Sequence, residues 1–194
     1  MNSYSASETA RSVYALVLTK LWFRGARLVR RPIYLRGRRH LRFGRGLTTG
    51  YRCRFDLGGG TQTGTTLTIG TGCHLGDSVH IVASESVVIG DHCLMASHIF
   101  ISDTTHGTYR GADQSRPDSA PNLRPLHQRP VSIGDNVWIG ENVCVLPGVS
   151  LGDGCIVNAN AVVTKSFPAH CMVAGAPARV IKRWNEELGE WLAE

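Results

Sequence analysis

The sequence contains no apolar run long enough to cross a membrane. In its N-terminal part, the apolar stretch between Arg11 and Lys20 is only eight residues long, whereas a transmembrane helix needs about 20. No small-residue cleavage site of the kind that ends a signal peptide follows this stretch. We therefore expect neither a membrane span nor a secretory signal.

Acidic residues are scarce in the first 56 residues. This part holds 13 of the 21 Lys and Arg residues but only 2 of the 15 Asp and Glu residues, so the basic excess of the chain arises there. Basic segments of this kind are attracted to anionic membranes and to nucleic acids. Because no recognition-helix or base-stacking motif accompanies the arginines, we expect no nucleic-acid partner.

Paired cysteines are also missing. The six cysteines are scattered along the chain and none forms a CxxC pair. We interpret them as free thiols that pack as small apolar side chains. Free thiols fit a reducing compartment, so the expected location is the cytoplasm.

What the sequence does contain is a six-residue period. Helical faces recur every 3.6 residues and strand faces every 2, so this period requires a chain that turns a corner every six residues. Short strands joined by turns then coil into an all-β solenoid in which each coil buries its apolar face against the next. The aliphatic residues at this period are Ile133, Ile139, Val145, Leu151, Val157 and Val163.

The period extends upstream in two further registers, which start at Ile69 and Ile89. An irregular first coil is expected within residues 43–56, followed by a loop at residues 57–66. The fifth place of each hexad holds an apolar side chain, mostly a small one, and predicts a second inward column. Its members are Cys73, Val79, Cys93, Ile99, Val137, Val143, Val149, Cys155 and Ala161.

Two helices are expected to flank the solenoid. Residues 7–31 have helical spacing with basic residues on the more polar side, and residues 178–192 carry large apolar residues at helical intervals. We predict an N-terminal basic amphipathic helix in residues 1–32, a solenoid in residues 33–177 and a C-terminal helix in residues 178–194. The first helix is interpreted either as lying on an anionic membrane surface or as capping the open end of the solenoid.

One long interruption breaks the period at residues 104–130. Loops of this length without structure of their own are uncommon in compact domains and are usually functional. We therefore predict that this loop protrudes from the solenoid and covers a site.

Six motifs follow one another in the second half: Ile101-Ser-Asp-Thr-Thr-His-Gly, Ile133-Gly-Asp-Asn-Val-Trp-Ile-Gly, Val145-Leu-Pro-Gly-Val, Leu151-Gly-Asp-Gly, Ala161-Val-Val-Thr-Lys and Val173-Ala-Gly-Ala-Pro-Ala-Arg-Val-Ile. In this order they resemble the hexapeptide-repeat acyltransferases, and among them the galactoside and maltose O-acetyltransferases. The likeness is greatest to the polysaccharide O-acetyltransferases of the O-antigen and colanic-acid type. The resemblance implies a left-handed parallel β-helix.

The resemblance also implies an acetyl-CoA-dependent O-acetyltransferase that acts on a sugar hydroxyl of a surface polysaccharide or of its lipid-linked precursor. An alcohol needs a base near neutral pH, and imidazole suits that task, so we expect His106 to be the general base. The backbone N–H of Glu141 is expected to bind the oxyanion. The family further implies direct transfer without an acyl-enzyme, in a homotrimer with active sites between subunits.

The acetyl-CoA-binding residues implied by the resemblance are Trp138, Ala159, Thr164, Lys165, Arg179 and Lys182. The cations among them suit the coenzyme phosphates. For Trp138, packing at a corner of the solenoid is the alternative role. Relatives that acetylate simple sugars contact the acceptor through an asparagine, which is missing from the aligned residues 75–80. Asp77, Ser78 and His80 are the candidate replacements, with solvated turn residues as the alternative reading. A larger acceptor, such as a lipid-linked oligosaccharide at the inner membrane face, would suit the basic loop and helix.

Other functions remain open at this point. Relatives with the same fold acylate amino sugars or the hydroxyl of serine. A zinc enzyme like the gamma carbonic anhydrases needs three converging imidazoles. The histidines here do not match that pattern, and we expect no metal. A solenoid without catalytic function would be indifferent to the replacement of His106.

Overall fold

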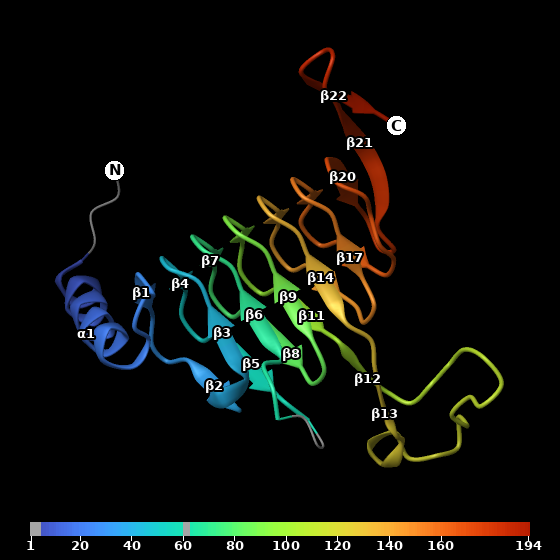
Figure 1. Cartoon of the computed structure of the whole chain (residues 1–194), viewed down its shortest axis with the longest axis horizontal. Coiled ribbons are helices and arrows are strands. Elements are labelled where there is room, and N and C mark those ends of the chain that lie inside the picture. Colours follow the sequence, from blue (N-terminus) through green and yellow to red (C-terminus); the bar gives the residue numbers. More distant parts are fainter. Residues whose placement is uncertain (1–4, 60–62) are drawn as a thin grey trace.

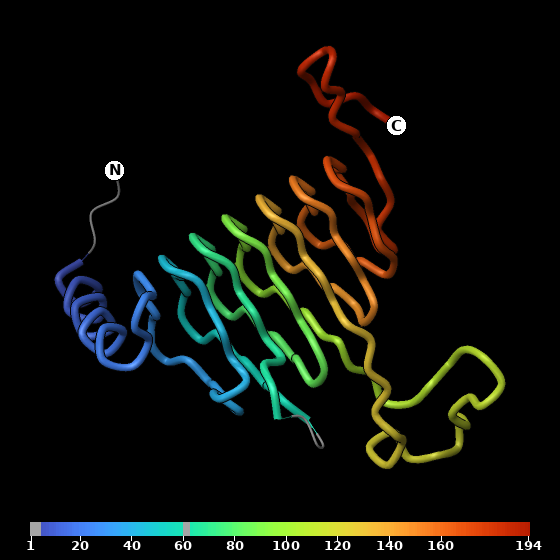
Figure 2. Tube along the Cα trace, in the orientation of Figure 1, coloured from blue at the N-terminus to red at the C-terminus, as the bar shows by residue number. Residues whose placement is uncertain are grey.

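The chain coils into a left-handed β-helix that carries one α-helix at its N-terminal end (Figure 1). The computed structural model describes residues 5–59 and 63–194. Residues 60–62 of the predicted loop 57–66 lie outside the described residues. Figure 2 shows the helix and the C-terminal segment at opposite ends of the stack of coils, with the loop of residues 104–130 projecting from its side.

Three sheets form the faces of the prism in the described residues, and we call them faces A, B and C. Face A contains β1 (Leu28–Val29), β4 (Thr48–Thr49), β7 (His74–Leu75), β10 (Leu94–Met95), β15 (Trp138–Ile139), β18 (Ile156–Val157) and β20 (Cys171–Ala174), and continues into β21 (Arg179–Asn185) and β22 (Glu190–Ala193). Face B contains β2 (Tyr34–Arg36), β5 (Arg54–Leu57), β8 (His80–Ala83), β11 (Phe100–Ser102), β16 (Cys144–Val145) and β19 (Val162–Val163). Face C contains β3 (Leu41–Phe43), β6 (Leu67–Ile69), β9 (Val87–Ile89), β14 (Val131–Ile133) and β17 (Ser150–Leu151).

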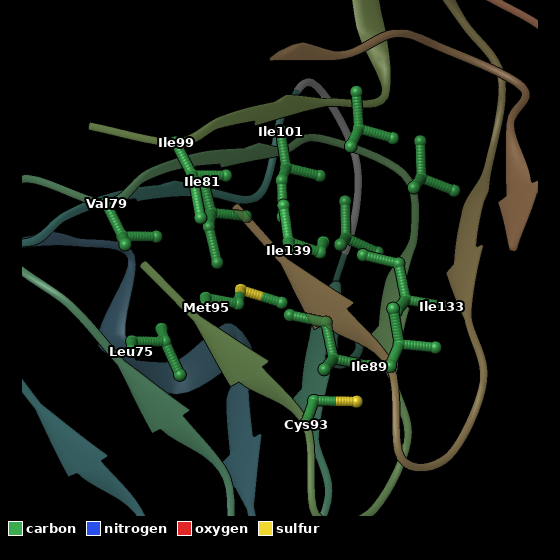
Figure 3. Packing of buried hydrophobic residues seen from close by; sticks show 14 of the residues in the cluster. Leu75, Val79, Ile81, Ile89, Cys93, Met95, Ile99, Ile101, Ile133 and Ile139 are labelled. Atoms are coloured by element: carbon green, nitrogen blue, oxygen red, sulfur yellow. The ribbon is translucent and has the colours of Figure 1, made fainter. Parts of the chain in front are cut away.

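Both predicted inward columns are confirmed, because every one of their members is buried. Equivalent residues of successive coils pair in parallel, so that Ile139 lies between Met95 and Val157. The same side chains therefore stack inside the prism, as Figure 3 shows for Ile81 and Ile101. Burial of one such aliphatic side chain contributes roughly 1.5–3 kcal/mol. The cysteines are free, and all except the half-buried Cys144 are buried, which confirms their interpretation as core residues.

The corners explain why turn-forming residues follow the aliphatic ones. We name each corner by the faces it joins, so that residues 140–143 form an AB corner and residues 146–149 a BC corner. The fourth hexad place has a positive φ, for example +57° at Asn142 and +83° at Gly148, a conformation that favours Gly and Asn. Coils also approach closely at the second place, since a Cβ on Gly140 would lie 2.6 Å from the amide nitrogen of Ala159.

Helix α1 (Ala6–Trp22) is shorter than predicted. It begins with a capping box formed by Ser5 and Glu8, and the prediction of helix up to residue 31 is wrong. The chain leaves the helix at Phe23, and Leu28–Val29 pairs with β4 as the first strand of face A. The first coil is therefore formed by residues 28–43, upstream of the one expected within residues 43–56. Within the described part of the chain, no helix has the combination of length and apolar character needed to cross a membrane.

The predicted C-terminal helix in residues 178–194 is wrong, because this segment forms a β-hairpin. Strand β21 pairs antiparallel with β20 and then with β22. The edge of β20 offers unpaired backbone groups, and β21 satisfies them. Trp184 and Trp191, which were expected on one helical face, instead pair across the hairpin with ring centroids 5.7 Å apart. The turn between them contains Gly189 with a φ of +65°.

Candidate active site

The long loop leaves the prism at the BC corner after β11 as a two-stranded arm. Strand β12 (Thr104–His106) pairs antiparallel with β13 (Leu126–Gln128), and a short 3₁₀ turn at Pro121–Leu123 lies beyond them. His106 is the last residue of β12, opposite Leu126. Its side chain is exposed, and its ring forms no hydrogen bond with residues 5–59 or 63–194. The predicted base is therefore an accessible imidazole where the arm opens.

Asp103 anchors the base of this arm. It is fully buried, and its carboxylate accepts hydrogen bonds from the backbone amides of Ser84, Glu85 and Ser86 at 3.0, 2.7 and 2.8 Å. It also accepts one from the Thr104 hydroxyl at 2.6 Å. The carboxylate thus binds the preceding coil rather than the His106 ring, and it fixes the point from which the arm starts.

We expect Asp103→Ala to lower the free energy of unfolding by at least about 3 kcal/mol, because three amides lose their acceptor and each unsatisfied buried donor costs about 1–3 kcal/mol. Urea unfolding monitored by circular dichroism measures this change. Asp118→Ala is the matched control, because that carboxylate lies on the same arm in an exposed pair with Arg116, and it should leave the midpoint unchanged. Equal midpoints for the two variants would contradict the anchoring role.

A groove of about 560 Å³ lies between the arm and the BC corners of the following coils. It brings one predicted coenzyme-binding residue, Thr164, to the residues that flank His106. Tyr109 closes one part of the arm, since its hydroxyl donates to the His106 carbonyl at 2.5 Å. The lining also contains Phe100, Ser102, Thr104, Thr105, Gly107, Thr108, Arg110, His127, Arg129, Leu146 and Pro147.

A second part of the predicted site lies at the AB corners, where side chains cap backbone amides from coil to coil. Tyr51 N–H donates to Asp77, Asp77 N–H to Ser97 and Ser97 N–H to Glu141, at 2.7, 3.1 and 2.9 Å. The next residue in this column is Ala159, which has no acceptor in its side chain. Among residues 5–59 and 63–194, the Glu141 amide therefore has no hydrogen-bond partner and remains free to donate.

Two further predicted residues lie beside this free amide. Trp138 is on the outer side of face A with half of its surface exposed, and Ala159 is exposed one coil further on. A similar ladder at the CA corner also ends in a free amide, at Asp153. No predicted site residue lies at that corner, so the combination with Trp138 and Ala159 is specific to Glu141 within the described residues.

One chain does not bring these two groups together. His106 and Thr164 lie at the BC corner, whereas Trp138, Glu141 and Ala159 lie at the AB corner or before it, so face B separates the two groups. Lys165 is exposed beside Thr164, with its ammonium 5.5 Å from the Phe167 ring centre. Arg179 and Lys182 lie on the C-terminal hairpin, where both side chains are exposed.

The three predicted acceptor-binding residues do not form one cluster. Asp77 and Ser78 form an AB corner, where the Asp77 carboxylate caps Tyr51 and Ser78 has a φ of +57°. His80 lies on the outer side of face B, and its ring is 5.3 Å from that of Phe100, which lines the groove.

His80 belongs to a charged cluster that the sequence did not reveal. Its Nε2 lies 3.1 Å from the Asp56 carboxylate, which also accepts from Arg54 at 2.7 Å. Burial by itself would raise the pKa of Asp56, but the hydrogen bonds from His80 and Arg54 outweigh it and lower this pKa. Asp56 lies 24 residues before His80 and becomes its neighbour only through the coil-to-coil register. A one-dimensional period of six gives no signal for such a pair.

No group of three His, Cys, Asp or Glu side chains converges as a metal site would require in the part of the chain that the structure describes. The histidines at corner positions, such as His92 and His98, occupy left-handed turns with φ near +57°. Their positions are explained by the turns.

The left-handed prism is the fold that the resemblance to the hexapeptide-repeat acyltransferases implied. The model of the hexapeptide repeat of succinyl-transferase matches residues 130–165. WbbJ of Escherichia coli strain K12, provisionally named a lipopolysaccharide biosynthesis O-acetyl transferase, is 39% identical over 182 residues, which cover 93% of this chain and 91% of WbbJ. The chain therefore belongs to the hexapeptide-repeat acetyltransferase family, and it is an acetyl-CoA-dependent acetyltransferase.

Solved structures agree with this assignment. A hexapeptide-repeat acetyltransferase from Vibrio cholerae in complex with acetyl coenzyme A has a TM-score of 0.55 and 26% identity, and the match covers 72% of each chain. A galactoside acetyltransferase in complex with coenzyme A has a TM-score of 0.55 and 27% identity, over 69% of this chain and 66% of that one. The predicted fold class and the predicted co-substrate class are thereby confirmed.

Proposed function

We propose that the protein transfers an acetyl group from acetyl-CoA to a sugar hydroxyl of a surface polysaccharide or of its lipid-linked precursor. The observation that carries this choice of acceptor is the 39% identity to WbbJ over nearly the whole of both chains. The groove beside His106 supports an acceptor larger than a simple sugar, because Arg110, His127 and Arg129 line it together with Phe100.

In the proposed mechanism His106 is the general base. Its ring accepts the proton of the sugar hydroxyl while the hydroxyl oxygen forms a bond to the thioester carbonyl carbon. The Glu141 amide donates a hydrogen bond to the carbonyl oxygen as negative charge develops there. When the carbon–sulfur bond breaks, His106 returns the proton to the departing thiolate. No step requires a cysteine, and every cysteine except Cys144 is buried.

The coenzyme is assigned to the groove between neighbouring prisms. Trp138 and Ala159 would contact the pantetheine arm near the Glu141 amide. Thr164, Lys165, Arg179 and Lys182 would contact the adenine and phosphate end. All four side chains are exposed. Lys165, Arg179 and Lys182 form no salt bridge within the described residues, and unpaired cations of this kind remain able to bind phosphate.

The catalytic unit is proposed to be a homotrimer. His106 and the Glu141 amide are separated by face B of a single chain, and they must act on the same carbonyl group. A BC corner from one copy and an AB corner from its neighbour supply both groups in one cleft. Three prisms related by threefold symmetry form three such clefts.

The proposed location is the cytoplasm, where acetyl-CoA is supplied, with peripheral contact to the inner face of the membrane. His80, Asp77 and Ser78 are assigned to the acceptor side of the cleft. Of these, His80 is supported best, since it contacts the Phe100 ring that lines the groove.

The test is an acceptor screen. Purified protein is incubated with acetyl-CoA and nucleotide-linked, lipid-linked and polymeric glycans, and thiol release is followed with a thiol reagent. We expect release with hydroxyl acceptors and an ester product that mild alkali cleaves. Release only with amino-bearing acceptors would overturn O-transfer in favour of an N-acyltransferase. The same assay with succinyl-CoA in place of acetyl-CoA tests which acyl group the protein transfers.

A further inference from the structure

Helix α1 exposes most of its large apolar side chains. The buried residues of the helix are Ala15 and Thr19. Thr19 is held against the first coil, because its hydroxyl accepts from the Val29 amide at 2.8 Å and donates to the Ala15 carbonyl at 2.7 Å. These contacts fix the rotation of the helix and direct its opposite side away from the solenoid.

The opposite side of α1 carries an apolar stripe. Val13, Val17 and Leu21 follow one another at intervals of four residues and are 55%, 53% and 61% exposed, with Tyr14 and Trp22 beside them at 60% and 55%. Soluble helices normally direct such a stripe toward the core. A contiguous exposed stripe of this kind marks an interaction surface. Helix α1, which carries the stripe, lies at the N-terminal end of the stack of coils (Figure 1).

Basic side chains surround the C-terminal half of this stripe. A groove of about 700 Å³ is lined by Leu21, Trp22, Arg24, Arg38, Arg39, Leu41, Arg42 and Phe43. A second groove, of about 460 Å³, lies next to it and is lined by Leu21, Trp22, Phe23, Arg31, Ile33, Leu35 and Arg38. Neither lining contains an acidic residue, and Glu8 is the only acid before residue 56. The surface therefore combines apolar side chains with uncompensated positive charge.

Arg31 forms no salt bridge with a carboxylate of residues 5–59 or 63–194. Its guanidinium lies 5.4 Å from the ring centres of both Trp22 and Phe23. Its Nε and one terminal nitrogen are buried without a hydrogen-bond partner in the described residues. An anion in this groove would lie close to this positive charge.

We propose that the stripe of Val13, Tyr14, Val17, Leu21 and Trp22, together with the arginines around it, binds the surface of an anionic phospholipid membrane. Apolar side chains enter the interface while Arg24, Arg38 and Arg42 meet lipid phosphates. A second copy of the same surface is disfavoured as the occupant, because it would bring two sets of arginines together. The inference rests on the proposed function, because membrane binding would hold the enzyme close to lipid-linked acceptors.

The test is co-sedimentation of the full chain with vesicles of phosphatidylcholine alone or mixed with phosphatidylglycerol. We expect binding to the mixed vesicles that weakens as salt is raised. Leu21→Glu should reduce the partition coefficient by about tenfold or more. Leu188→Glu is the matched control, because Leu188 is also 61% exposed but lies in the C-terminal hairpin, and it should bind like the unaltered protein. Arg24→Gln/Arg42→Gln should reduce binding by roughly thirtyfold.

Three results would overturn the inference. The first is absence of binding to either kind of vesicle. The second is equal binding by the Leu21→Glu and Leu188→Glu proteins. The third is that Leu21→Glu forms a smaller assembly in light scattering while no vesicle binding is seen, a result that would assign the stripe to a second copy. Acetyl transfer to a water-soluble acceptor is measured in parallel and should be the same for both leucine variants. Vesicle binding without any transfer would contradict the proposed function alone.

Discussion

Replacement of His106 by alanine is expected to reduce kcat for acetyl transfer by about 10²- to 10⁴-fold, the usual contribution of a general base. The affinity for coenzyme A should remain close to that of the unaltered protein. The side chain is exposed and its ring forms no hydrogen bond with the described residues. The substitution therefore removes a proton acceptor but breaks no hydrogen bond of the fold. Steady-state kinetics by thiol release and coenzyme binding by calorimetry measure the two quantities separately.

His92→Asn is the control for His106→Ala. His92 is an exposed corner histidine with a φ of +56°, and the equivalent corner of the next coil already uses Asn136 at +57°. This substitution therefore fits the turn and should leave kcat unchanged. If His106→Ala retained the full rate, His106 would not be the base. A non-catalytic scaffold or another proton acceptor would then be the better account.

Replacement of Glu141 by proline is expected to reduce kcat by about 10²- to 10³-fold, the cost of losing one oxyanion donor. Proline removes the amide hydrogen that the structure leaves free, and it fits the turn. At the following BC corner Pro147 already occupies the equivalent place, before Gly148 with a φ of +83°, just as Asn142 has a φ of +57° after Glu141. Proline is favoured at the second position of turns of this type.

Glu141→Ala separates the amide from the carboxylate. It keeps the backbone donor and removes only the acceptor of the Ser97 amide, whose hydrogen bond is 2.9 Å long. We expect a small loss of stability and a rate within a few-fold of the unaltered enzyme. If alanine and proline reduced the rate equally, the carboxylate or the local structure would be responsible, and the oxyanion assignment would be wrong. Thermal unfolding of both variants shows whether the corner is intact.

The six-residue period was enough to predict the architecture, because this period is set by steric rules within each coil. Inward places such as Ile139 and Val143 are buried, and the places between them either turn or face solvent. The period also revealed the arm, since residues 104–130 interrupt it. Local pattern was enough for these features, because every coil repeats the same backbone geometry against an equivalent neighbour.

The ends of the solenoid did not follow from the period. Residues 28–31 continue the helical spacing of α1, yet Leu28–Val29 joins face A because β4 offers a parallel partner. Trp184, Leu188 and Trp191 are spaced as on a helix, yet their segment forms a β-hairpin, because β21 pairs with the open edge of β20. In both cases an exposed sheet edge outweighed local propensity, and such an edge exists only once the coils have stacked.

The sequence by itself determined the prism, its two inward columns, the interrupted coil and the ordered motifs of the family. Only the tertiary structure decided that α1 exposes its apolar stripe, that Asp56 meets His80, and that His106 and the Glu141 amide lie on opposite edges of face B. The reason is physical. A six-residue period fixes which side chains point inward, whereas contacts between coils and the rotation of a docked helix depend on distances that no linear pattern contains.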